Sequence, residues 1–407
     1  MSAPLPPSGS YISSVRESCR ALRTASGISI PPNQIEALLR APALVDTFSR
    51  LASIHGISFP LSFPSLKSEL NFLATLALLN FASGYREALH KATGRGAYDN
   101  IRLLVMGMYI DSSDSLMSAR GWTELSDGQI AQLLNVSIHE ERAHETIPGL
   151  VVAERGGQLS ELVGLITRTL KEAGEVLVKG GYSDLGAFVV EGLEVAKGSA
   201  EVLVERLVKA IPGFRDMGVV DGQRECLFFI WLVGIYGVGI FVAAVYLFKK
   251  ALFLVHAITL RFQGTSGIVV PDTSNLPVFS DNVLPSMLVH LGILDLSSGP
   301  APLKEAFPDA NNPDKITKLY EAAIPSEAKR GSPTRKSPLL DARNAYILRA
   351  AAVDACEEIV RVARQGEEEW GKNMTLPELD GWLWSVAKDR TDYRDLPRFA
   401  ERGTVWY

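Results

Sequence analysis

The chain has 407 residues, of which 47% are hydrophobic and 21% are charged, and its formal net charge is −5. This length and composition predict a globular protein with a sizeable core. General nucleic-acid binding requires a basic excess that neutralises phosphates, and the acidic balance argues against it. The three cysteines are far apart and lack CxxC spacing, which favours neither a disulfide framework nor a thiolate zinc site and indicates a reduced, cytoplasmic compartment.

The chain begins with a stretch rich in proline, serine and glycine, so residues 1–12 are predicted to be disordered, and they lack the pattern of a secretory signal. Beyond them, apolar residues recur at helical spacing. Leu159, Leu162, Ile166 and Leu170 share one helix face. Strand-like alternation is rare. The sequence therefore predicts an all-α, compact multi-helix domain over residues 13–407.

Several helix starts can be placed from capping residues. Ser126 with Gln129, and Thr375 with Glu378, have the spacing of capping boxes. Asp184, with Ser183 beside it, and Ser199 are predicted to cap two further helices. Residues 298–338 are predicted to be loop-rich. Their basic end, KRGSPTRKSP, is interpreted as a solvated loop, with a phosphorylatable tail or a basic recognition patch as alternatives.

Residues 226–248 form an apolar run without a charged residue, CLFFIWLVGIYGVGIFVAAVYLF. Its length and composition meet the usual criterion for a transmembrane helix. A membrane-anchored protein is therefore one alternative, and an extended buried helix is another.

His139 and His144 invite a metal-site interpretation, since two histidines on one helix face with a glutamate between them bind zinc in metalloproteases. That motif places the histidines four residues apart, whereas these are five apart. The sequence therefore predicts a polar helix surface here, and no metal.

Three clusters combine charge with apolar surroundings. Lys249 and Lys250 follow the apolar run directly. Asp281 lies between two apolar segments, where it could also be a helix N-cap. Asp380 and Trp384 are one helical turn apart, so a carboxylate and an indole share one face that suits a flat polar ligand.

Together these clusters resemble the queuosine salvage protein family, the queuosine 5′-phosphate N-glycosylases, from about residue 45 to the C-terminus. The matching stretches are Leu79–His90, Gly94–Ala97, Ala119–Trp122, His144–Gly149, Ile211–Asp216, Leu247–Ala251, Phe279–Asp281, Leu288–Leu294, Leu383–Trp384 and Thr404–Tyr407. The resemblance implies an all-α fold, similar in part to the helix-hairpin-helix DNA glycosylases. It also implies cleavage of queuosine 5′-phosphate to queuine and ribose 5-phosphate without a metal or another cofactor.

The resemblance also implies the site. It gives the catalytic aspartate as Asp281, the active-site lysine as Lys249, and a second ligand-binding aspartate as Asp380. The remaining substrate-binding residues expected are Trp384, Lys250 and Phe279 from the same stretches, together with Asn282 and Arg349. The sequence departs from the family at Leu252, Ala345 and Ile347, and the apolar residues 224–244 look inserted, either as an untranslated segment retained in the gene or as an extended buried helix. The partner is a small nucleotide, with neither nucleic acid nor membrane expected.

The substrate dictates the chemistry that the residues must supply. A 7-deaza base has carbon in place of N7, so protonation there cannot assist its departure, and catalysis has to act on the sugar. A carboxylate facing C1′ can stabilise the oxocarbenium-like state and orient water. The alternatives are a non-catalytic helical binding protein, the membrane-anchored protein, and a DNA or RNA glycosylase, which the charge balance disfavours.

Overall fold

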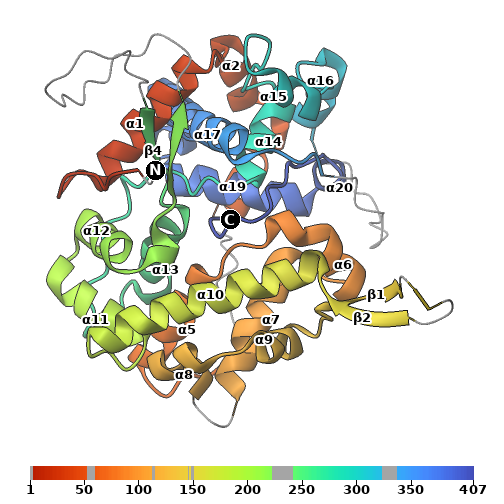
Figure 1. The fold of residues 1–407 in the computed structure, drawn as a ribbon. Helices are drawn as coiled ribbons and strands as arrows, with labels where there is room; N and C mark the ends of the chain where they lie inside the picture. The colour runs from red at the N-terminus through yellow and green to blue at the C-terminus, as the bar shows by residue number, and fades with distance from the viewer. Residues whose placement is uncertain are drawn as a thin grey trace, which may run out of the picture. The chain divides into compact units, whose positions relative to one another are not determined.

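The computed structural model describes residues 3–52, 60–111, 115–144, 146–147, 151–221, 242–322 and 337–407. Twenty α-helices, three short 3₁₀ helices and two two-stranded sheets make up its regular structure in these ranges. The prediction of a mostly helical protein is confirmed (Figure 1). No helix among the described residues is long and apolar enough to cross a membrane.

The chain divides into two compact units; its length predicts one large domain or two closely packed ones, and the sequence pattern is assigned to one domain over 13–407. Unit 1 comprises residues 1–58, 216–252 and 272–399, and unit 2 comprises 59–215, 253–271 and 400–407. Each unit is assembled from segments that are distant in sequence. Helix α13, Lys249–Phe262, begins in unit 1 and ends in unit 2.

Unit 1 contains most of the C-terminal helices together with the N-terminal ones. Its helices are α1 Tyr11–Ala25, α2 Pro32–Arg40, α3 Pro42–Val45, α4 Phe48–Leu51, α14 Val283–His290, α15 Ala301–Ala306, α16 Pro313–Tyr320, α17 Ala342–Gln365, α18 Glu369–Lys372, α19 Leu376–Asp389 and α20 Thr391–Arg394. Its strands are β3 Met217–Asp221 and β4 Val242–Tyr246, which pair antiparallel.

Unit 2 is built around the long helix α10, Gly157–Lys179. The other elements are α5 Leu66–Leu78, η1 Ser83–Tyr85, α6 Arg86–Thr93, α7 Ala97–Ile110, η2 Ser115–Met117, α8 Ala119–Glu124, α9 Asp127–Leu134, β1 His139–Ala143, β2 Val151–Arg155, α11 Leu185–Ala196, α12 Ala200–Ala210 and η3 Pro212–Phe214. Helix α10 packs against α8 and α9 through a face that includes Leu162, Ile166 and Leu170, all fully buried.

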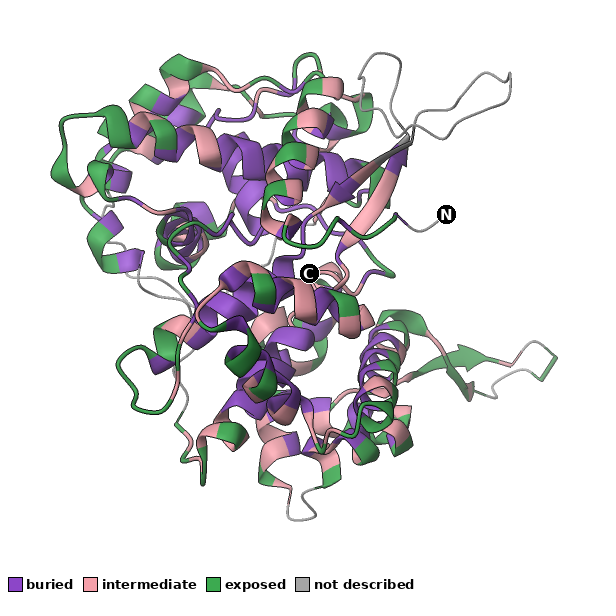
Figure 2. Cartoon of the chain, turned by 90° about the vertical axis from the view of Figure 1, so that its left-hand side faces the viewer, coloured by how far each residue is buried: buried purple, intermediate pink, exposed green. Residues whose placement is uncertain are grey.

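Burial follows the helical periodicity that the sequence shows. The inward faces of the helices are buried and their outward faces exposed (Figure 2). Helix α17 is an exception, since its N-terminal half is buried on every side, from Asn344 to Cys356. A helix buried all round belongs in a core, and α1, α14 and α19 pack against α17.

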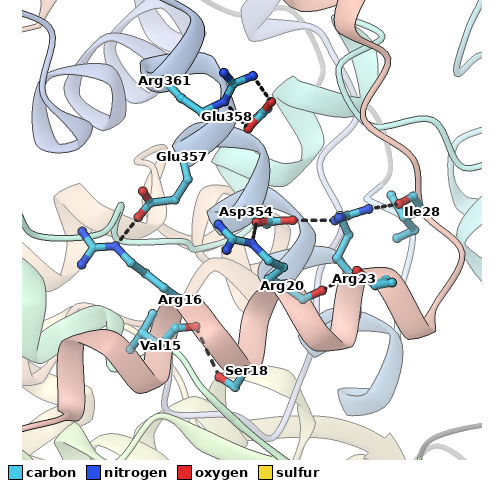
Figure 3. A network of polar contacts seen from close by, with 11 residues as sticks. Val15, Arg16, Ser18, Arg20, Arg23, Ile28, Asp354, Glu357, Glu358 and Arg361 are labelled. Atoms are coloured by element: carbon cyan, nitrogen blue, oxygen red, sulfur yellow. Dashed lines mark hydrogen bonds and ion pairs between the residues drawn. The ribbon is translucent and has the colours of Figure 1, made fainter. Parts of the chain in front are cut away.

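Ion pairs connect helix α1 to α17 (Figure 3). Arg16 Nε lies 2.5 Å from Glu357, and Arg20 and Arg23 share the carboxylate of Asp354 at 3.0 and 2.6 Å. Asp354 is nearly buried, so two guanidinium groups compensate its desolvation.

All the predicted helix caps are present. The capping boxes of Ser126 with Gln129 and Thr375 with Glu378 open α9 and α19. Asp184 and Ser199 accept hydrogen bonds from the first turns of α11 and α12.

Three predictions of local structure were wrong. Residues 3–12 are ordered, since Ala3 is buried, Pro4 accepts a hydrogen bond from Tyr246 Oη at 2.8 Å, and α1 begins at Tyr11. His139 lies in strand β1, and His144 just beyond it, rather than on a helix. The predicted loop region 298–338 contains α15 and α16. Residues 323–336, with the basic KRGSPTRKSP stretch up to residue 336, lie outside the described residues.

Of the apolar run, residues 226–241 lie outside the described residues, so the predicted transmembrane or buried helix is not described. Its last residues are described. Val242–Tyr246 form β4, which pairs with β3 from Asp221 opposite Val242 to Met217 opposite Tyr246. Residues 242–244, predicted to belong to an insert, are therefore part of β4. Just beyond the Met217–Tyr246 pair, Asp216 lies beside Leu247.

Candidate active site

The predicted catalytic residues come from three separate segments of unit 1. Lys249 is the first residue of α13, Asp281 lies two residues before α14, and Asp380 is in the second turn of α19. These positions place two of the three side chains where the chain enters a helix.

Lys249 is placed by the β3–β4 ladder. The backbone carbonyl of Asp216, just before β3, accepts hydrogen bonds from the N–H groups of Leu247 and Phe248 at 2.9 and 3.0 Å. Phe248 has a φ of +47°, a left-handed conformation that a residue with a side chain adopts at a cost. Its ring is fully buried against Tyr11 and Tyr246, with centroids 5.6 and 5.7 Å away. These contacts hold the strained turn that leads into Lys249.

Asp281 lies in a segment whose neighbours are each held by a hydrogen bond. Phe279 donates its backbone N–H to Asp380 Oδ2 at 2.7 Å. Ser280 donates its hydroxyl to the backbone carbonyl of Arg349 at 3.0 Å. The Asn282 amide donates to the Phe399 carbonyl at 2.8 Å. The backbone on both sides of Asp281 is therefore fixed.

Asp281 itself is half-buried and partly engaged as a cap. Its Oδ1 accepts hydrogen bonds from the N–H groups of Val283 and Leu284, at 2.6 and 3.4 Å. Asn282 is the N-cap residue of α14, so the capping alternative raised from the sequence is met only in that Asp281, one residue earlier, accepts N–H groups of the first turn. Within the described part of the chain, both bonds use Oδ1, which leaves Oδ2 oriented by the cap and available to a ligand.

The charges of Lys249, Asp281 and Asp380 act on one another. Lys249 is 5% exposed. Burial lowers its pKa to about 8, against the opposing effect of the Asp281 charge. Burial likewise raises the pKa of Asp380 to about 8; the Phe279 N–H counteracts this, and the charge of Asp281 adds to it. At neutral pH the site therefore holds a lysine cation and a protonated carboxylic acid.

Lys250 and Arg349 face the protein interior. Lys250 is fully buried, and burial together with the neighbouring Lys249 charge lowers its pKa well below the ordinary value. Arg349 is 1% exposed and forms a bidentate ion pair with Asp216. Its Nε and Nη2 also donate to the Ser280 carbonyl at 3.0 and 2.9 Å. We therefore assign both side chains to the support of the site.

Trp384 is half-buried one turn after Asp380 on α19, as the sequence predicts. The ammonium of Lys388 lies over its ring, 3.0 Å from the centroid. A flat ligand that stacks on this face has to displace the exposed Lys388 side chain. Phe279 and Asn282 contribute through the hydrogen bonds described above, in which they hold Asp380 and the segment around Asp281.

Sequence reasoning missed three residues of this arrangement, namely Asp216, Ser280 and Tyr346. Asp216 is fully buried and receives the guanidinium of Arg349, and Tyr346 Oη lies 3.5 Å from its Oδ1. Asp216 ends the stretch Ile211–Asp216 that carries part of the family resemblance, so a signal for it was present. Ser280 likewise lies within the matching stretch Phe279–Asp281, whereas nothing in the local pattern marks Tyr346.

The arrangement can stabilise a positive charge and donate a proton or hydrogen bond at one place. Acid–base cleavage of glycosidic bonds uses two carboxyl groups, so Asp281 and Asp380 have the side chains that this chemistry requires. No family model and no curated protein matches this chain.

Proposed function

We propose that this protein hydrolyses the N-glycosidic bond of queuosine 5′-phosphate and releases queuine for salvage into tRNA. The observation that carries the proposal is that three distant segments meet in unit 1: Phe279, two residues before Asp281, donates its N–H to Asp380 at 2.7 Å, and the charges of Asp281 and Asp380 act on the buried Lys249. Asp281, Lys249 and Asp380 are the residues that the family resemblance implies for catalysis and ligand binding.

In the proposed reaction, the bond between C1′ and the base nitrogen breaks and its electron pair leaves with the base. Asp281 stabilises the positive charge that develops on the ribose and orients a water molecule toward C1′. The water oxygen bonds to C1′, and its proton passes to the carboxylate and finally to the departing base. The products are ribose 5-phosphate and queuine.

Asp380 suits the base side of this reaction. One carboxyl oxygen accepts the Phe279 N–H, so the other can carry the proton and donate a hydrogen bond to the base. Such a donor stabilises negative charge that builds up on the leaving group. A buried donor also discriminates against ligands that cannot accept from it.

Lys249 supplies the positive charge that an anionic nucleotide requires in a protein of net charge −5. Lys250 is less suited to this role, because its side chain is fully buried. Trp384 offers its indole for stacking. We place the reaction in the cytoplasm, a proposal supported by the buried, unpaired thiols Cys19 and Cys356.

The direct test incubates the purified protein with queuosine 5′-phosphate and measures queuine and ribose 5-phosphate by mass spectrometry. Asp281→Asn should bind the nucleotide in calorimetry and lose turnover. Asp272→Asn is the matched control, because Asp272 also accepts a backbone N–H two residues on, from Ser274, and is exposed.

The outcomes separate the alternatives. Binding without turnover in the wild-type protein indicates a non-catalytic binding protein. Base release from polynucleotide, with binding that weakens as salt rises, indicates a nucleic-acid glycosylase. Equal turnover in wild type and Asp281→Asn refutes the assigned role of Asp281.

A further inference from the structure

We infer that the buried pair of Asp216 and Arg349 is a positioning device that sets the backbone of Lys249 and Asp281 relative to each other. This inference rests on the proposed function, since it concerns the geometry of the same site. Neither residue is proposed to contact the reacting atoms.

Asp216 controls the Lys249 side. Its backbone carbonyl holds the N–H groups of Leu247 and Phe248, and its Oδ2 lies 3.4 Å from the N–H of Lys249. One residue thus accepts from three consecutive N–H groups at the start of α13. The left-handed Phe248 lies among them, so Asp216 also holds the strained backbone in place.

Arg349 controls the Asp281 side. Two of its nitrogens donate to the Ser280 carbonyl, and Ser280 returns a hydrogen bond from its hydroxyl to the Arg349 carbonyl. This reciprocal contact fixes the residue immediately before Asp281. The same guanidinium forms two bonds to Asp216, at 3.1 and 2.5 Å. A single planar group therefore links the two catalytic segments.

Stability alone does not account for this pair. The exposed fractions of Arg349 and Asp216 are 1% and 0%. Apolar residues of similar volume often replace a buried ion pair without loss of stability, because desolvation offsets the attraction. What they cannot reproduce is the fixed fork of donors, which lysine lacks as well. A geometric role explains why two charges occupy a position that apolar side chains could fill.

The decisive variant is the double substitution Asp216→Leu with Arg349→Met. We expect it to fold with a melting temperature close to that of the wild type and to lose about 100-fold in kcat, the scale on which misplaced catalytic groups act. Arg349→Lys, which keeps the charge, should also lose kcat with a smaller change in KM. A folded double variant with the kcat of the wild type would overturn the inference.

A second readout does not depend on turnover. The pKa of Lys249 can be followed by NMR on labelled lysine side chains, with the signal assigned by its loss in Lys249→Met. This pKa should rise in Arg349→Gln and fall in Asp216→Asn, because the charges of Arg349 and Asp216 act on Lys249 in opposite directions. Arg23→Gln, which removes another ion pair on α17, is the control and should leave this pKa unchanged.

The two readouts distinguish the failure of each idea. If the wild type does not cleave queuosine 5′-phosphate, the proposed function fails while the lysine titration still tests the pair. Unchanged Lys249 titration in both single variants would refute the positioning role even in an active enzyme.

Discussion

Replacing Lys249 by methionine should stabilise the protein at neutral pH while it abolishes turnover. Burial lowers the lysine pKa from 10.5 to about 8, so the folded state disfavours the cation that the unfolded chain carries freely. The difference corresponds to about 3 kcal/mol at pH 7. Methionine has a similar length and no charge to desolvate, so the variant should gain most of this free energy.

The sign of the pH dependence follows from proton linkage. Between pH 8 and 10.5 the unfolded chain binds more protons at this lysine than the folded protein does, so its contribution to stability rises with pH. The cost is complete below pH 8 and absent above 10.5. The advantage of Lys249→Met should therefore be about 3 kcal/mol at pH 7 and should shrink as pH approaches 10.5.

The assay is urea unfolding of wild type and variant at several pH values. The dependence of the free energy of unfolding on urea concentration should be equal in the two proteins, which shows that they expose the same amount of surface on unfolding. Lys304→Met on α15 is the control, since Lys304 is exposed and its replacement should change the free energy of unfolding by less than about 0.5 kcal/mol. A Lys249→Met protein that is less stable than the wild type at pH 7 would refute the reasoning.

Three further predictions concern the pH profile and two local contacts. In the wild type, log kcat/KM should fall above pH 8 with a slope approaching −2, because both Lys249 and Asp380 lose protons there. Asp380→Asn should reduce this slope to −1, and an unchanged slope would contradict the role of the Asp380 proton. Thr375→Ala, which removes the capping box of α19, should cost about 1 kcal/mol in urea unfolding. Gly218→Ala should destabilise by about 1–3 kcal/mol, because the added carbon would lie 2.8 Å from the Tyr346 ring, and wild-type stability would exclude this contact.

Local features of the chain were predictable where neighbouring residues determine them. The capping boxes at Ser126 and Thr375 follow from hydrogen bonds that span three residues, and they occur where the sequence places them. The apolar face of α10 follows from helical periodicity. Prediction was wrong where a distant contact decides. Order at the N-terminus depends on burial of Ala3 and on the hydrogen bond from Tyr246, more than 200 residues away.

The candidate site shows the same division. The chemical types of Asp281, Lys249 and Asp380, and the places of Asp281 and Asp380 before and within helices, could be read from the chain. The place of Lys249 at the start of α13 could not, because the apolar run before it predicted a helix that ends there, whereas strand β4 precedes it. The pKa values of these residues could not either, since these depend on how deeply other segments bury them. Nor could the roles of Lys250 and Arg349, because a charged residue in a sequence looks the same whether it faces a ligand or another side chain.

By itself the amino-acid sequence determined the helical class, the helix starts and the residues able to do acid–base chemistry, because these depend on spacing and on side-chain type. Only the tertiary structure decided that β3 and β4 bring Asp216 to Lys249, and that Arg349 connects this turn to the segment before Asp281. The physical reason is that hydrogen bonds and burial act over a few ångströms, and only the folded chain brings residues 216, 249, 281 and 349 within that range.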